Sequence, residues 1–408
     1  MSTTAKNTDR DDQAGLPAFP AERAARCPLD PPPAYADWRK AEGLQRAVRK
    51  NGGPVWVVSR YEDVRAALAD PRLSSDSRNP NSPQHTPGND IRAVIHMDAP
   101  EHAEHRRMLA GEFTVKRLNA WRPGIEKVVN QFLDEMISKG RPADLVQEFA
   151  LPVPSMVICL MLGVPYSDHA FFQERSAYLV NPKATPEEVG RASVEILQYM
   201  GELVERKERE PGDDILSRQV HDYVLKGDMT RERAALNGLT LLVAGHETTS
   251  NMIGLSVVAL LKNPEIAARI READNRATAA NAVEELLRYL SIAITPMHRV
   301  ATEDLTIGGQ LIRAGEVVTV NLPAANRDSA FLADADTLDI DRSTRGHVAF
   351  GHGPHQCLGQ NLARIEMEIA LPALLRRLPG LRIAVPEDQI EYRHDMNTYG
   401  VHALPVTW

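Results

Sequence analysis

The sequence contains little cysteine: Cys27, Cys159 and Cys357 are its three thiols in 408 residues. Three scattered cysteines cannot form a disulfide framework, and they cannot supply the ligand set of a zinc or iron–sulfur centre. The composition suits a reducing compartment, so we predict a cytoplasmic protein.

Long apolar segments are missing as well. The N-terminus, MSTTAKNTDRDDQAG, has no hydrophobic core for a signal peptide or anchor, and its polar composition predicts partial disorder over residues 1–30. The most apolar region, residues 234–261, is interrupted by polar and charged side chains between Asn237 and Asn251. A bilayer would penalise these groups, so the region is predicted to be a buried helix and not a membrane span.

No long run of lysine and arginine occurs, and the formal net charge is -8. This charge argues against a nucleic-acid-binding surface. Helical patterns dominate, and the strand-like segments are short, so we predict a mainly α protein with small β-sheets. The helices are expected at 119–139, 186–209, 231–261, 279–290 and 358–378, and the strands at 55–59, 312, 317–320, 381–385 and 401–406.

Two segments are predicted to be loops that flank a substrate entrance. Residues 74–90, SSDSRNPNSPQHTPGND, are rich in Ser, Pro and Asn, and residues 180–186 separate two helical segments. Long loops in compact proteins often carry function, so both are candidates for a mobile entrance.

The most informative segment is FGHGPHQCLGQNLAR, residues 350–364, in which Cys357 lies in a glycine-rich loop just before a helical pattern. A thiol near a helix N-terminus faces unpaired N–H groups and the positive end of the dipole, which favour the thiolate that binds iron. Glycines would let the backbone approach a flat cofactor closely. Taken alone, a single intracellular cysteine such as Cys357 is usually an inert buried thiol.

The segment resembles the heme-binding signature of the cytochrome P450 superfamily, of the actinobacterial type. The matching residues are Phe350, Gly351, Gly353, His355, Cys357, Leu358, Gly359, Leu362, Ala363 and Arg364. The resemblance extends from about residue 31 to 408 and implies a single catalytic domain over that range. It implies heme b (iron protoporphyrin IX), with Cys357 as the iron ligand, between a long distal helix and the helix that follows the cysteine loop.

A second motif lies upstream, in TLLVAGHETTSN, residues 240–251. Ala244, Gly245, Glu247 and Thr248 match the oxygen-binding helix of the family. Dioxygen must receive two protons before its O–O bond breaks, and the resemblance assigns proton delivery to Glu247 and Thr248 as the catalytic residues. Without the cysteine signature, these side chains would read as helix-interior polar groups bonded to backbone.

The resemblance also assigns cations to the two heme propionates: His102, Arg106, Arg299 and His355. His102 and Arg106 are four residues apart and share a helix face, although both could be solvated surface residues. Glu285 and Arg288, three residues apart, match the buried Glu–Arg pair of the family and receive a structural role. An isolated pair at this spacing would be a surface pair of little energetic weight.

The family fold implies a substrate pocket above the heme. Its expected lining is mostly apolar, which suits a medium-sized or large hydrophobic molecule, although each apolar residue taken singly is more often core. Besides Ala244 and Thr248, the expected lining residues are Val94, Ile95, Leu179, Val180, Leu241, Ile292, Ala293, Thr295, Thr398 and Tyr399.

The implied function is a heme-thiolate monooxygenase that inserts one oxygen atom from O2 into this substrate, most simply by hydroxylation. The chain has no flavin or iron–sulfur motif, so electrons from NAD(P)H are expected to arrive through a ferredoxin reductase and a ferredoxin. We expect a monomer. The alternatives are a peroxide-driven heme enzyme of the same fold and a non-catalytic heme sensor, and the Glu247–Thr248 pair argues against both.

Overall fold

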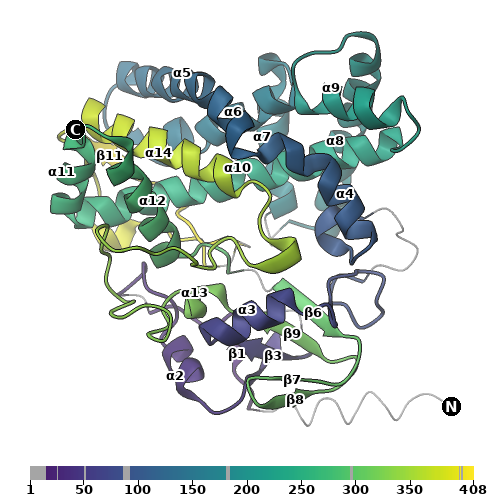
Figure 1. Cartoon of the computed structure of the whole chain (residues 1–408). Coiled ribbons are helices and arrows are strands. Elements are labelled where there is room, and N and C mark those ends of the chain that lie inside the picture. Colours follow the sequence, from purple (N-terminus) through teal and green to yellow (C-terminus); the bar gives the residue numbers. More distant parts are fainter. Residues whose placement is uncertain are drawn as a thin grey trace. The chain divides into compact units, whose positions relative to one another are not determined.

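The structure is a computed structural model that describes residues 15–24, 26–49, 52–85, 92–180, 184–294, 297–394, 396 and 398–408. The chain divides into two compact units, each assembled from separate stretches of sequence. Unit 1 comprises residues 1–103, 288–338 and 344–357, and unit 2 comprises residues 104–287, 339–343 and 358–408. Figure 1 labels helices and strands of both units where there is room.

Unit 1 is built on a sheet with the strand order β1-β2-β3-β9-β6-β4. β3 and β9 are rich in valine, which suits buried strands, and they pair in parallel with Trp56 opposite Val318. Helix α3 packs on the sheet, and its buried Tyr61, Val64 and Leu68 belong to the same core cluster as strand residues. The bounds are β1 Ala18–Phe19, α2 Ala34–Lys40, β2 Gln45–Arg49, β3 Pro54–Val58, α3 Tyr61–Ala69, β4 Leu73–Ser74, η1 Val94–His96, β6 Met297–Ala301, β7 Leu305–Ile307, β8 Gln310–Ile312, β9 Val317–Val320, α13 Leu322–Ala325 and η6 Gly353–His355.

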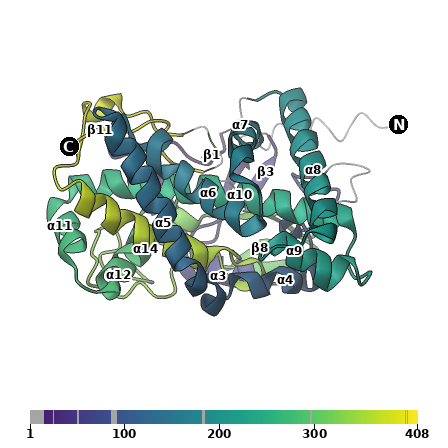
Figure 2. The ribbon, with the colours of Figure 1, turned by 90° about the horizontal axis from the view of Figure 1, so that it is seen from above.

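Unit 2 is mainly helical, and the long helix α10 lies at its centre. α10 packs against α6, α8 and α14, as Figure 2 shows from above. The bounds are α4 Glu101–Ala110 (which begins in unit 1), η2 Gly111–Phe113, α5 Val115–Lys139, β5 Ala143–Asp144, η3 Val146–Ala150, α6 Pro152–Leu162, η4 Tyr166–Asp168, α7 His169–Val180, α8 Pro186–Arg209, α9 Ile215–Gln219, η5 Val220–Val224, α10 Arg231–Lys262, α11 Pro264–Glu272, α12 Arg276–Leu290 (which ends in unit 1), α14 Gln360–Arg377, β10 Arg382–Ile383, η7 Glu387–Gln389 and β11 Pro405–Thr407. Strands β10, β11 and β5 form a small sheet.

Local sequence signals set the ends of the main helices. The Thr230 side chain accepts from the backbone N–H of Arg233 and so caps the first turn of α10. Helix α6 begins with Pro152 at its first turn and stops at Gly163, whose φ of 74° is left-handed. These caps satisfy backbone groups that would otherwise be left without partners at the ends of buried helices.

The predicted fold class is confirmed, because helices dominate and the sheets are small. The predicted helix 186–209 is found with the same bounds, and 231–261 is found one residue longer. The predicted strand 381–385 is shorter, and of 401–406 only the last part is a strand. In the described part of the chain, no helix is both long and apolar enough to span a bilayer.

Candidate active site

In unit 1, the segment before Cys357 is a tight, backbone-bonded loop. Gly351 and Gly353 both have φ of 72°, a left-handed conformation that favours glycine. The backbone N–H of Cys357 donates to the Phe350 carbonyl over 2.9 Å, which closes the loop. A Cβ on Gly353 would lie 2.7 Å from the Leu68 carbonyl oxygen, so the loop lies directly on α3. The loop thus presents Cys357 as an exposed side chain just ahead of α14.

The same unit brings two of the predicted histidines together. The rings of His102 and His355 stack, with centroids 3.9 Å apart. His102 is buried on α4, and its backbone N–H donates to the Asp98 carbonyl over 2.8 Å. The Nε2 atom of His355 lies 3.3 Å from the hydroxyl oxygen of Ser75. The N–H groups of these imidazoles are hydrogen-bond donors of the kind that a carboxylate-bearing ligand needs.

Arg299, on β6, is buried in unit 1. Burial lowers the pKa of its guanidinium, and the Asp98 charge acts in the opposite direction. Its Nη1 donates to the His298 carbonyl over 2.9 Å. Within the described part of unit 1, no carboxylate lies within ion-pair distance of Arg299, so a buried cation remains available for an anionic ligand.

In unit 2, the central turn of α10 carries small and polar residues in place of bulky core side chains. A Cβ on Gly245 would lie 3.0 Å from Cγ1 of Ile158, so the glycine allows α6 to pack closely. Thr248 donates its hydroxyl to the Ala244 carbonyl over 2.8 Å, and Ala244 is exposed one turn before it. Leu241, Ala244 and Thr248 follow helical spacing and share one face of α10.

Glu247 lies on a different face of α10 and is buried. Its Oε1 accepts a hydrogen bond from Nη1 of Arg393 over 2.6 Å. Burial raises the pKa of Glu247, while the charge and hydrogen bond of Arg393 act to lower it. A buried acid with one cationic partner is therefore present on α10 at the predicted position.

A model of the family described as cytochrome P450 matches residues 46–389 of the chain. The chain belongs to the cytochrome P450 family. It is 48% identical to cytochrome P450-SU2 of Streptomyces griseolus, over 100% of both proteins. It is 42% identical to mycinamicin VIII C21 methyl hydroxylase of Micromonospora griseorubida, over 96% of this chain and 99% of that protein. The crystal structure of cytochrome P450 MoxA from Nonomuraea recticatena matches with a TM-score of 0.88 and 46% identity, and the match covers 97% of this chain and 99% of that one.

The P450 fold, the monooxygenase activity and the cofactor heme b follow from this membership. The residues present also fit heme b on their own chemistry. Cys357 supplies an exposed soft ligand for iron, and Arg299, His102 and His355 supply donors for carboxylates. A Cβ on Gly351 would meet no atom within 4 Å, and the same holds for Gly359, so both positions leave room for a flat group.

Other predicted site residues of this P450 are divided between the units. Arg106 lies on the part of α4 that belongs to unit 2 and is partly exposed, one turn after His102. In unit 1, Val94 and Ile95 form part of η1, Ile95 is 56% exposed, and Ile292 and Ala293 follow α12. In unit 2, Leu179 and Val180 end α7, Leu241 is on α10, the Thr398 hydroxyl accepts a hydrogen bond from Asn251, and Tyr399 is buried. Thr295 lies outside the described residues.

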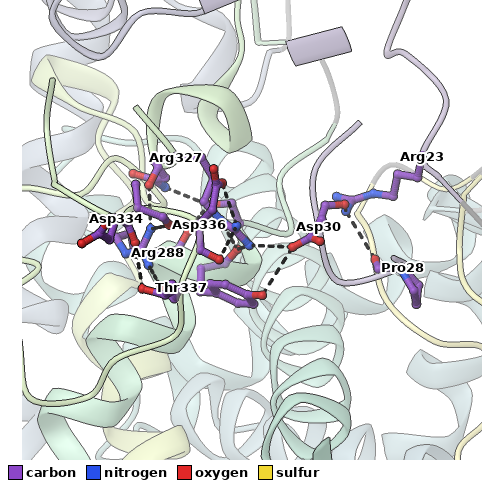
Figure 3. A network of polar contacts seen from close by, with 12 residues as sticks. Arg23, Pro28, Asp30, Arg288, Arg327, Asp334, Asp336 and Thr337 are labelled. Carbon is purple, nitrogen blue, oxygen red and sulfur yellow. Dashed lines mark hydrogen bonds and ion pairs between the residues drawn. The ribbon is translucent and has the colours of Figure 1, made fainter. Parts of the chain in front are cut away.

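Glu285 and Arg288 are both fully buried, and each carries a large set of hydrogen bonds. Arg288 donates to the backbone carbonyls of Asn326, Ala335 and Thr337 in unit 1, a network drawn in Figure 3. In unit 2, Glu285 accepts from Arg342 over 3.0 Å and from the backbone of Asp339. These bonds tie α12 to the irregular segment before the cysteine loop.

Sequence reasoning missed two arginines of this P450, Arg342 and Arg393. Each bonds to a carboxylate that the sequence did single out, Glu285 and Glu247 respectively. Neither arginine lies in a recognisable motif, and the positions of Glu247 and Arg393 differ by 146 residues. No local signal could have paired them.

Proposed function

We propose that this P450 hydroxylates a medium-sized or large hydrophobic natural product, with electrons passed from NAD(P)H through a ferredoxin reductase and a ferredoxin. The observation that carries this proposal is the acid–alcohol pair on α10: a buried Glu247 and, next to it, a Thr248 hydroxyl. Such a pair has a purpose in an enzyme that must supply protons for the reduction of O2. A peroxide-driven enzyme or a heme sensor has no need of it.

Each residue would have a distinct task. Cys357 would hold the iron, and His102, Arg106, Arg299 and His355 would hold the propionates. The bound heme supplies the activation of O2 and the transfer of one oxygen atom. Ala244 would leave space beside the heme. Glu247 would move protons inward from solvent, and Thr248, whose hydroxyl can both donate and accept, would pass them on.

The substrate class is supported by the expected pocket lining, which is mostly apolar with a few hydroxyl groups such as Thr398 and Thr248. The printed names of relatives include pentalenic acid synthase and mycinamicin VIII C21 methyl hydroxylase. By analogy, we propose a hydrophobic secondary metabolite as the substrate of this chain. A panel of such compounds, scored by the shift of the ferric heme from low to high spin, would narrow the choice.

The proposed iron ligand is tested by the absorption spectrum of the reduced protein with carbon monoxide. We expect a strongly red-shifted Soret band in the native protein, because a thiolate donates charge to the iron. Cys357→Ser should lose that band, whereas Cys159→Ser, which alters a buried cysteine in α6, should keep it. A red-shifted band in the Cys357→Ser protein would mean that this ligand assignment is wrong.

A further inference from the structure

In unit 2, residues 391–393 pair with residues 400–402 to form a C-terminal hairpin. This hairpin contacts α10 at Glu247, the proposed proton-transfer acid. The backbone N–H of Arg393 donates to the Gly400 carbonyl over 2.9 Å, and that of His402 donates to the Glu391 carbonyl over 2.8 Å. Tyr392 pairs with Val401 in an antiparallel bridge between these two bonds. The backbone of Arg393 is thus fixed within a hairpin, although its position is remote in sequence from α10.

Two glycines allow this hairpin to pack closely on α10. A Cβ on Gly400 would clash with Oδ1 of Asn251, and a Cβ on Gly254 would lie 3.3 Å from Cγ2 of Val401. Larger residues at these two positions would push the hairpin and the helix apart. The close packing brings the guanidinium of Arg393 to the buried side of α10.

The guanidinium contacts two side chains that are one helical turn apart. Nη1 of Arg393 donates to Oε1 of Glu247 over 2.6 Å and to Oδ1 of Asn251 over 3.3 Å. Nδ2 of Asn251 in turn donates to the Thr398 hydroxyl over 2.8 Å, which returns to the hairpin. The Glu247 carboxylate therefore belongs to a hydrogen-bond network, and this network fixes its orientation.

Arg393 is the cation that acts on Glu247 in the described part of unit 2. Burial raises the pKa of Glu247, and the charge and hydrogen bond of Arg393 are the two influences that lower it. The neighbouring His246 is buried and its pKa is lowered by burial and by Arg393, so it adds no positive charge near neutral pH. Glu366, on α14 beside Thr249, is fully buried, and burial raises its pKa to about 8, so it adds little negative charge at pH 7.

We propose that Arg393 is a positioning residue for proton delivery: its ion pair holds the Glu247 carboxylate in place and favours the ionised form, so that the acid can take up a proton again after each transfer. This inference rests on the proposed role of Glu247. It assigns to the C-terminal hairpin a task in the reaction, in addition to any contact with substrate.

The test compares Arg393→Gln, Arg393→Lys and Glu247→Gln with the native holoenzyme. The control is Arg382→Gln, which removes the same charge from an exposed position on β10. The first readout is the infrared pH titration of the carboxyl band that Glu247→Gln abolishes. Loss of an adjacent cation should move this titration up by roughly 1–3 pH units in Arg393→Gln. Arg393→Lys should stay close to the native curve.

The second readout is the fraction of NADH that ends in product and its solvent isotope effect. General acids contribute about 10²–10⁴-fold to rates, and we expect the loss of orientation alone to cost roughly tenfold in coupled turnover, with a larger isotope effect. All variants should retain the red-shifted carbon monoxide band. Arg393→Lys covers the case in which Arg393→Gln fails to fold, since its coupling should fall although its titration does not move.

The outcomes separate the two proposals. If Glu247→Gln is impaired but both Arg393 variants behave like Arg382→Gln in titration and coupling, the positioning role is wrong and the role of Glu247 stands. If Glu247→Gln is itself fully coupled, the proposed relay is wrong, and the inference about Arg393 falls with it.

Discussion

The Thr248 hydroxyl is a small group with two distinct uses. In the structure it donates to the Ala244 carbonyl, a bond that threonines in helices often form, and its lone pairs remain able to accept. Ala244 is exposed and Thr248 is partly buried, whereas the neighbouring His246, Glu247 and Thr249 are buried. The hydroxyl is therefore not locked into the core, and its loss should cost little stability.

We predict that Thr248→Ala uncouples the reaction. Without the hydroxyl, protons are delivered less selectively, so NADH consumption should continue while roughly tenfold less of it yields product and more hydrogen peroxide is released. The measurement is peroxide and product per NADH. Thr248→Ser, which keeps the hydroxyl, should remain close to native, and an alanine variant with native coupling would contradict the assigned role.

Residues that act through a short motif could be predicted, and residues that act through distant partners could not. His102 and His355 each lie in a motif that the sequence displays, although their stacking is seen only in the structure. The bond from Arg342 to Glu285 and the bond from Arg393 to Glu247 join residues far apart in the chain. Tertiary packing alone brings each pair together, so composition and spacing carry no trace of it.

At the scale of elements, the helices with strong end signals were the easiest to predict. α8 has Pro186 in its first turn, acidic residues Glu187 and Glu188 near its N-terminus, and basic residues near its C-terminus. No helix was predicted at α6, whose sequence PVPSMVICLML is buried on nearly all sides and includes two prolines. Without a polar face, such a helix shows no 3.6-residue period. The short strands were also hard to predict, because β3 finds its partner β9 only in the folded chain.

We predict that Thr185→Ala weakens the start of α8. The Thr185 hydroxyl accepts from the backbone N–H of Glu188, and the Glu188 carboxylate accepts from the backbone N–H of Thr185, which forms a capping box. Removing the cap should cost about 1 kcal/mol. The amides of the first turn should exchange hydrogen faster, as measured by hydrogen–deuterium exchange with mass spectrometry.

Ser193→Ala, which removes a hydroxyl bonded to the Val189 carbonyl within the helix, should leave the exchange of these amides unchanged. Equal exchange in the Thr185→Ala protein would show that the cap is not what holds this helix end.

At the scale of the whole molecule, the predicted site residues of this P450 lie in segments of both units, and the chain alternates between the units. The chain passes from unit 1 to unit 2 directly after Ala103 and again directly after Cys357, close to two predicted heme contacts. Sequence patterns report neighbours within one segment, and this is why the motifs could be predicted but the membership of the two units could not. The net charge, by contrast, can be counted directly from the sequence.

The net charge of -8 sets the conditions for the proposed electron donor. An acidic ferredoxin would be repelled by the molecule as a whole, so productive docking requires a local basic surface. We propose two separate candidate contacts, Arg107 on unit 2 and the pair Arg345 and His352 on unit 1; the two arginines are exposed, and His352 is partly exposed. Arg107→Glu and Arg345→Glu should each lower the rate of heme reduction by an acidic ferredoxin by roughly tenfold at low salt, as stopped-flow absorbance would measure. Salt should slow the native reaction by screening this attraction, and it should have a weaker effect on the variants.

Arg382→Glu changes the net charge by the same amount at an exposed site on β10, so it separates local docking from overall repulsion. If all three variants lose the same fraction of the native rate, the repulsion is global and the proposed contacts are wrong; if Arg382→Glu stays close to native while Arg107→Glu and Arg345→Glu fall, the donor docks on these contacts.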